Sequence, residues 1–124
     1  MYLLDTDILS NLLKPAPSTI LMAKLASVPA ERLFTSSITL GELVYGAHRL
    51  GARAAALLEQ IDRTLLPNRP VLPFDDAAAL RYGEVRAELE QRGTPLDEAD
   101  LRIAAIALAR NLAVVTGNVR HFQR

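Results

Sequence analysis

The chain contains 124 residues with a mass of 13.5 kDa, and its 14 Lys and Arg balance its 14 Asp and Glu, so the formal net charge is +0. Half of the residues are hydrophobic, enough to close one core at this length, which excludes a disordered chain. The absence of cysteine excludes disulfide scaffolds, thiolate metal sites and cysteine nucleophiles. No apolar run reaches the roughly 18 to 20 residues that span a bilayer. An acid as early as Asp5 argues against a signal peptide. We therefore expect one cytoplasmic domain over residues 1–124, with no membrane partner.

The balance of charge argues against nucleic-acid binding through overall electrostatics. The basic residues are nevertheless biased, because 12 of the 14 are arginine and only Lys14 and Lys24 are lysine. The planar fork of arginine suits phosphate and carboxylate groups, so the bias is consistent with local contacts to oxyanions. A GC-rich genome, which the 19 alanines also suggest, explains the same bias without any function.

The first half of the chain alternates short apolar runs with helical spacing. Residues 2–5 form an apolar run that ends at an acid and predict a buried strand. The spacing then predicts a helix capped by Thr6 or Asp7 and ended by Pro15, and a second helix over 20–28 with Ile20 facing inward. A second strand over 33–35 precedes helical spacing up to Leu50. The stretch from 52 to 66 is helical by composition, and 67–70 is a loop.

The second half repeats this alternation. Residues 71–72 predict a third strand, followed by a long helix that Asp75 or Asp76 caps and Gly93 closes. Thr94 has the spacing of a cap for the next helix, which runs to about residue 108, and residues 112–116 predict the last strand. Strands that alternate with helices predict a three-layer α/β/α sandwich around a mainly parallel sheet.

Polar side chains follow the predicted strands at one edge of this sheet. Asp5 ends the first strand, Thr116 and Asn118 follow the last, and Glu42 lies near the start of a helix that leaves the second. Asp100, expected in the second turn of its helix, joins them because helices in such folds begin at the carboxyl edge. Gathered carboxylates repel one another unless a cation neutralises them, and an all-oxygen ligand set suits magnesium or manganese.

Purely structural roles are possible for several of these acids. Asp5 could begin an Asx-turn at the strand end, and Asp7 could serve as a helix cap. Asp100 has no capping role, and its spacing to the apolar residues that follow places it on the stripe that faces the sheet. A buried ionised carboxylate is costly unless it is paired or binds a metal, so Asp100 carries most of the functional interpretation.

Two other acids have the spacing of a capping box. Glu42 follows Thr39 by three residues, and Asp97 follows Thr94 by three. For Glu42 a structural and a catalytic role are equally compatible with the sequence, whereas capping is the preferred interpretation of Asp97. The two histidines lack a partner at metal-ligand spacing and are interpreted as surface residues: His48 and His121.

Four segments in this order carry a family resemblance: LLDTDILS, SSITLGELVYG, GTPLDEADLRIAAIALARN and VVTGNVRHF. Together they resemble the PIN domain, and especially the VapC-type toxins of type II toxin–antitoxin systems, over essentially the whole chain. The relatives continue past the phenylalanine matched by Phe122 into another short strand, whereas this chain stops at Arg124. Either the chain is cut short or that edge strand is dispensable.

The resemblance implies which residues carry the chemistry. The first three acids of the family match Asp5, Glu42 and Asp100, which are the expected metal ligands, and the variable fourth position matches Asn118. Asn118 offers no charge and would act through water or substrate. The resemblance leaves supporting roles beside these ligands for three residues: Thr6, Asp97 and Thr116.

The resemblance further implies a magnesium-dependent endoribonuclease, with manganese as a substitute, in which metal-activated water hydrolyses an RNA phosphodiester. It also implies a homodimer and a heterocomplex with a cognate antitoxin. The alternative is a non-catalytic PIN module that acts as an antitoxin-bound, DNA-binding autorepressor. A receiver domain has a similar length and acidic site, but it requires a lysine after a late strand, and the only lysines are Lys14 and Lys24.

Overall fold

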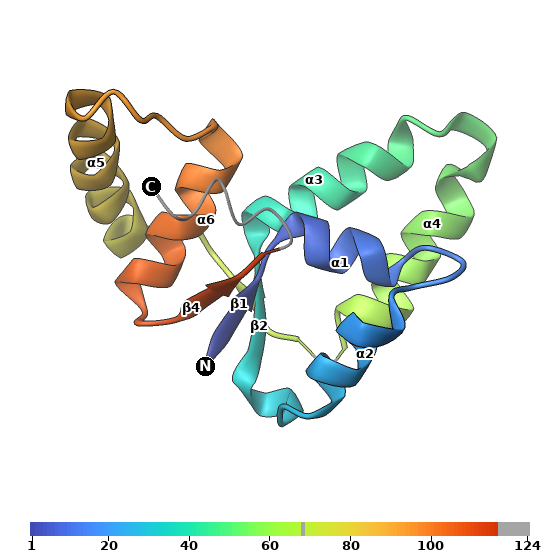
Figure 1. The fold of residues 1–124 in the computed structure, drawn as a ribbon. Coiled ribbons are helices and arrows are strands. Elements are labelled where there is room, and N and C mark those ends of the chain that lie inside the picture. Colours follow the sequence, from blue (N-terminus) through green and yellow to red (C-terminus); the bar gives the residue numbers. More distant parts are fainter. Residues whose placement is uncertain (68, 117–124) are drawn as a thin grey trace.

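A four-stranded parallel sheet forms the centre of the computed structural model, which describes residues 1–67 and 69–116 (Figure 1). The strands are β1 (Tyr2–Leu4), β2 (Leu33–Ser36), β3 (Val71–Leu72) and β4 (Ala113–Val115), in the spatial order β3-β2-β1-β4. In the registers, Tyr2 pairs with both Leu33 and Ala113. Because every pairing is parallel, the carboxyl ends of the strands share one edge.

One face of the sheet is covered by the helices of the first half of the chain. These are α1 (Thr6–Leu12), α2 (Thr19–Ala26), α3 (Ser37–His48) and α4 (Ala54–Gln60). Leu4 of β1, which is fully buried, points to this face. The buried cluster consists of eight side chains: Leu4, Ile8, Leu9, Leu33, Leu43, Ala47, Ile61 and Leu65.

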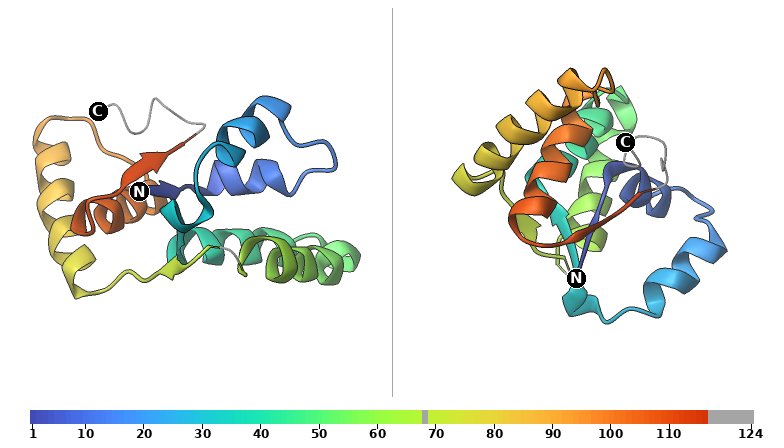
Figure 2. Two further views of the ribbon diagram at one scale, coloured as in Figure 1. Left: turned by 90° about the horizontal axis from the view of Figure 1, so that it is seen from below. Right: turned by 60° about the vertical axis from the view of Figure 1, so that its left-hand side comes forward.

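The opposite face is covered by α5 (Asp76–Gln91) and α6 (Glu98–Ala109), which lie side by side in both views of Figure 2. Leu3 points to this face, since successive strand residues alternate sides. Its buried cluster consists of five side chains: Leu3, Ala78, Ile103, Ile106 and Ala107. The predicted three-layer α/β/α arrangement is therefore confirmed.

Two details of the helices differ from the prediction. Ile20 is 70% exposed, because α2 turns Leu21 and Leu25 toward the core and leaves Ile20 on its outer side. The predicted helix over 52–66 divides into the 3₁₀ turn η2 (Gly51–Arg53), α4 and the π turn η3 (Ile61–Leu65). Among the described residues, no helix is long and apolar enough to cross a membrane.

Two predicted helix starts also shift, because a different residue provides the cap. Asp5, rather than Thr6 or Asp7, caps α1, and Asp97, rather than Thr94, caps α6. The predicted end of α5 is confirmed, since Gly93 adopts a φ of 70° and its N–H donates to the Glu90 carbonyl at 3.1 Å.

Alanine substitutions at two glycines in or next to α5 should change the free energy of unfolding in opposite directions. Gly83 lies inside α5, and a Cβ added there would meet no atom within 4 Å. Gly83→Ala should therefore raise the free energy of unfolding by about 0.5–1 kcal/mol, as measured by urea denaturation. Gly93→Ala has equal space but a positive φ, and should lower it by about 1 kcal/mol. Equal shifts for the two variants would contradict the conformations assigned here.

Candidate active site at the carboxyl edge of the sheet

Asp5 is fixed at the junction between β1 and α1. Its backbone N–H donates to the Val115 carbonyl at 3.1 Å, which continues the parallel pairing with β4 by one residue. Its side chain turns back and accepts the Ile8 N–H on Oδ1 at 3.0 Å, which makes it the N-cap of α1. The residue is only 2% exposed. The carboxylate is therefore a rigid and buried group at the predicted edge.

The environment of Asp5 disfavours its charge. Burial raises the pKa of this carboxyl above its usual value, and hydrogen bonds from the Thr116 side chain and the Ile8 N–H only partly offset the effect. The nearby negative charge of Asp7 adds to the increase in pKa. Thr116, predicted to support the site, is thus brought to the Asp5 carboxylate. A cation beside Asp5 would stabilise its ionised form.

Glu42 reaches the same edge from α3 and is held by α1. The Thr6 hydroxyl donates to the Glu42 carboxylate in a short hydrogen bond and lies 3.2 Å from the hydroxyl of Thr39. Thr39 is fully buried, so this contact anchors Thr6 to the interior. Glu42 itself is an exposed residue. Thr6, predicted as a supporting residue, therefore orients an accessible carboxylate.

The capping-box alternative for Glu42 is wrong. The helix α3 begins at Ser37, and its N-cap is Ser36, whose hydroxyl accepts the Thr39 N–H at 3.1 Å. Glu42 consequently lies in the second turn, beyond the reach of the orphan N–H groups at the helix start. Its carboxylate is available for chemistry at the sheet edge.

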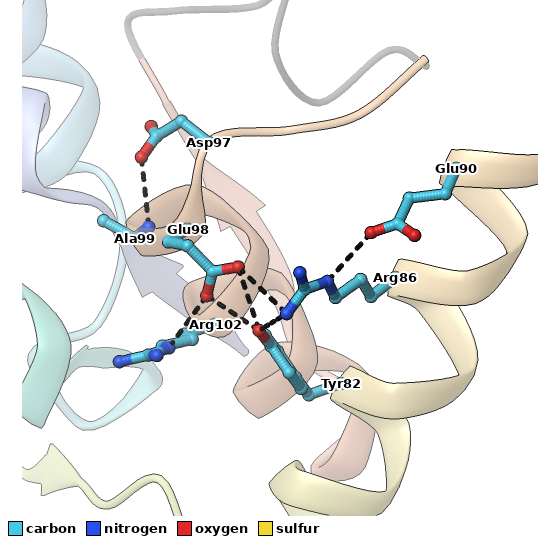
Figure 3. Close-up of polar contacts among 7 residues, drawn as sticks. All are labelled: Tyr82, Arg86, Glu90, Asp97, Glu98, Ala99 and Arg102. Carbon is cyan, nitrogen blue, oxygen red and sulfur yellow. Dashed lines mark hydrogen bonds and ion pairs between the residues drawn. The ribbon is translucent and has the colours of Figure 1, made fainter. Parts of the chain in front are cut away.

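Asp97 and Asp100 occupy different positions at the start of α6. Asp97 is the N-cap, and its Oδ1 accepts the Ala99 N–H at 3.1 Å (Figure 3). The sequence favoured a capping role for Asp97 together with Thr94. In the structure Asp97 has a capping role, but its own side chain forms the cap and Thr94 is not the N-cap. Asp100 lies in the first turn rather than the second, and it is partly buried beside the buried Leu101. The predicted inward position of Asp100 is therefore confirmed in part.

The helices α1, α3 and α6 all begin at the end of the sheet where β1 and β4 finish (Figure 1). They bring Asp5, Glu42 and Asp100 to one edge. Within residues 1–67 and 69–116, however, no three His, Cys, Asp or Glu side chains are grouped closely enough to hold a metal ion. Asn118 lies outside the described residues. The structure thus places the three acids at one edge without assembling them into a common ligand set.

The chemistry of these donors fits a hard divalent cation. All three predicted ligands offer carboxylate oxygens, which magnesium and manganese prefer to nitrogen or sulfur. The buried Asp5 gives a further reason to expect a cation. Its pKa is raised because the hydrogen bonds to its carboxylate do not fully offset the cost of burying the negative charge. The donor set therefore fits the metal in type.

The sequence did not predict the contact network that fixes the first turn of α6 (Figure 3). The Glu98 carboxylate accepts the Tyr82 hydroxyl at 2.7 Å and pairs with Arg86 at 3.4 Å and Arg102 at 3.3 Å. The guanidinium of Arg102 also lies over the ring of Phe74. The i,i+4 spacing of Glu98 and Arg102 was the available signal. This network ties α6, and with it Asp100, to α5.

Comparison with known proteins identifies the family. Residues 2–124 match the PIN domain. The chain is 38% identical over 125 residues to a tRNA(fMet)-specific endonuclease VapC of Salmonella typhimurium, covering 99% of this chain and 90% of the relative. It is 34% identical over 126 residues to the toxin FitB of Neisseria gonorrhoeae, covering 98% and 91%.

Solved structures agree with this assignment. FitAcB from Neisseria gonorrhoeae superposes with a TM-score of 0.91 at 34% identity, covering 99% of this chain and 91% of that one. DNA-bound VapBC from Salmonella typhimurium gives a TM-score of 0.89 at 36% identity, covering 99% and 90%. The chain therefore belongs to the PIN-domain family, among relatives of the VapC type.

Proposed function

We propose that this chain is a magnesium-dependent endoribonuclease and the toxin of a toxin–antitoxin pair, with manganese as a substitute metal. The observation that carries the proposal is the buried Asp5 carboxylate, with its raised pKa, at the sheet edge that Glu42 and Asp100 also reach. Such a residue set suits phosphodiester hydrolysis because it offers a cation site and an accessible base. The names of relatives, which include ribonuclease VapC1 of Haemophilus influenzae, support the same activity.

Each acid has a distinct role in this proposal. Asp5 and Asp100 would hold the metal, and Glu42 would orient or deprotonate the attacking water or hold a second ion. A bound magnesium ion polarises the scissile phosphate and lowers the pKa of bound water. Thr6 would keep the Glu42 carboxylate aimed at the edge through its hydrogen bond. Asn118 would contact water or substrate. In-line attack would leave a 5′-phosphate and a 3′-hydroxyl.

The proposal includes a protein partner and a second copy of the chain. The solved neighbours include VapBC-5 from Mycobacterium tuberculosis, a member of the VapBC family of toxin–antitoxin systems, which supports a cognate antitoxin. An arginine of that antitoxin would fit the acidic edge, since a guanidinium satisfies the carboxylates and takes the place of the cation. The homodimer and the RNA substrate rest on the family resemblance. Two relatives are named tRNA(fMet)-specific, so initiator transfer RNA is the first substrate to test.

The second candidate is a non-catalytic module that binds DNA together with its antitoxin. DNA-bound complexes among the solved neighbours favour this candidate. The buried acid serves both candidates, because a guanidinium of the antitoxin would satisfy it as a metal cation would. Relatives named endonuclease and ribonuclease favour catalysis as the primary function, and repression would be a property of the whole complex.

Removing either proposed metal-binding carboxylate should abolish cleavage. Asp5→Asn and Asp100→Asn each remove a charge at the edge, and the loss of transition-state stabilisation should lower kcat by on the order of 10³-fold. The assay follows 5′ ends of initiator transfer RNA with magnesium, and growth after induction reports the same loss in cells. Calcium, which accepts looser geometry, should bind but support little cleavage. Full toxicity of both variants would contradict the metal assignment.

Asp97 and Asp100 should differ in what they affect. Asp97→Ala removes the cap of α6 and should lower the free energy of unfolding by about 1 kcal/mol, with at most a severalfold loss of activity. Asp100→Ala should have the opposite profile, with a stable fold and no cleavage. Thermal unfolding and cleavage rates of the two variants, measured side by side, provide the comparison. An equal loss of cleavage rate in both variants would show that Asp97 belongs to the catalytic set.

Asp5→Asn should stabilise the metal-free protein at neutral pH. Asparagine keeps the helix cap, and it removes a charge that burial disfavours. The folded pKa of Asp5 lies above the unfolded value near 3.8, so the wild type gains stability as pH falls through that folded pKa. Urea unfolding in a chelating buffer should therefore show a difference that shrinks on acidification. A wild type that is the more stable protein at neutral pH would refute this assignment.

A further inference from the structure

A groove leads away from the candidate active site between α1 and α3. Its volume is about 360 Å³, and its lining includes Thr6 and Glu42, the hydrogen-bonded pair at the sheet edge. Both helices start at that edge and run away from the sheet (Figure 1). The lining continues to Lys14, which follows α1, and to Arg53, which follows α3. One end of the groove is therefore the proposed site of cleavage, and the other end carries two cations.

The two cations are available for a ligand. Lys14 and Arg53 are both exposed, and no carboxylate of the described residues forms an ion pair with either. Many other arginines, in contrast, are paired with acids of the same chain. The paired arginines are Arg63, Arg81, Arg86, Arg92, Arg102 and Arg110. The positive charge beside the groove is thus uncompensated on a chain that is neutral overall.

The lining of the groove also includes a glycine inside a helix. Gly46 lies within α3, where glycine costs roughly 1 kcal/mol relative to alanine. A Cβ added at Gly46 would meet no atom within 4 Å, so tight packing inside the chain does not require glycine there. A missing side chain leaves the backbone open to close approach by a ligand. Gly83 in α5 is equally open, so Gly46 does not by itself indicate a ligand; it leaves room in the groove beside the two cations.

We infer that the groove binds the sugar–phosphate backbone of the RNA beside the cleaved bond, with Lys14 and Arg53 each neutralising a phosphate. This inference rests on the proposed ribonuclease function and adds a substrate-binding surface to it. The seven residues of α1 span roughly 10 Å, several times the axial rise of about 3.4 Å per nucleotide in one strand. The groove is therefore long enough for the backbone of about three nucleotides to lie along it. Gly46 gives that run room against α3.

RNA is the occupant that the position of the charges favours. Backbone phosphates recur at every nucleotide, so a strand that is cut beside Glu42 presents further negative charges along the groove. Contacts to phosphate position the strand without reading its sequence, so any RNA should report them. An acidic protein segment is the competing occupant, and the experiment below distinguishes it.

The test reverses the two charges and measures RNA binding without cleavage. Lys14→Glu, Arg53→Glu and the double variant are compared with Lys24→Glu, which reverses an exposed lysine on α2 outside the groove lining. Fluorescence anisotropy with fluorescein-labelled initiator transfer RNA in a chelating buffer gives Kd at several salt concentrations. We expect each groove variant to weaken binding severalfold and to lower the salt slope by about 0.7. Lys24→Glu should match the wild type.

Steady-state cleavage with magnesium provides a second measurement on the same variants. Loss of phosphate contacts away from the reacting bond should raise KM and leave kcat unchanged. Groove variants that match Lys24→Glu, in a wild type that binds and cuts RNA, would overturn the inference alone. Unchanged RNA binding together with weakened antitoxin binding would assign the groove to a protein and also overturn it. A wild type that neither binds nor cuts RNA overturns the proposed function and this inference with it.

Filling the groove separates binding from folding. Gly46→Leu places a side chain in the groove but improves helix propensity, so RNA binding should weaken severalfold while the free energy of unfolding is maintained or rises. Gly83→Leu, inside α5 and equally open, is the matched control and should leave RNA binding unchanged. Wild-type RNA affinity in Gly46→Leu would contradict an occupied groove.

Discussion

The organisation of the site depends on one hydrogen bond, from the Ile8 N–H to Oδ1 of Asp5. The bond caps α1, and it fixes the carboxylate at the end of β1 in a position that water hardly reaches. The same turn of chain therefore starts a helix and positions a desolvated acid. Thr6, the next residue, orients Glu42 across the gap to α3. The turn from β1 into α1 thus positions Asp5 directly through the cap and Glu42 indirectly through Thr6.

Much of the fold was predictable because it depends on local patterns. Short apolar runs bounded by acids, Pro and Gly identified all four strands, and alternation with helices then required a parallel sheet with one shared carboxyl edge. The predicted acids reached that edge for the same reason. The caps were not predictable in the same way. Asp5 and Thr6 are both acceptable cap residues, and Asp5 is used because its backbone is still extended, with a φ of -82° and a ψ of 177°.

Contacts between helices could not be predicted, because they join residues far apart in sequence. Tyr82 and Glu98 are 16 residues apart, and their contact depends on how α5 crosses α6. The π turn at Ile61–Leu65 and the outward position of Ile20 depend in the same way on how a helix meets the core. The sequence also predicted a common ligand set, whereas the described side chains reach one edge without forming it. Side-chain orientation lies beyond what spacing along a chain can specify.

The double duty of Asp5 has a consequence for how such a protein fails. A change from aspartate to asparagine replaces one carboxylate oxygen by an amide nitrogen of similar size and retains the oxygen acceptor that caps α1. The Asp5→Asn variant would thus remain folded and would keep the surface to which a protein partner binds. For the proposed toxin, selection against nuclease activity would therefore remove activity at this position and leave an intact surface in the cell that still binds the antitoxin.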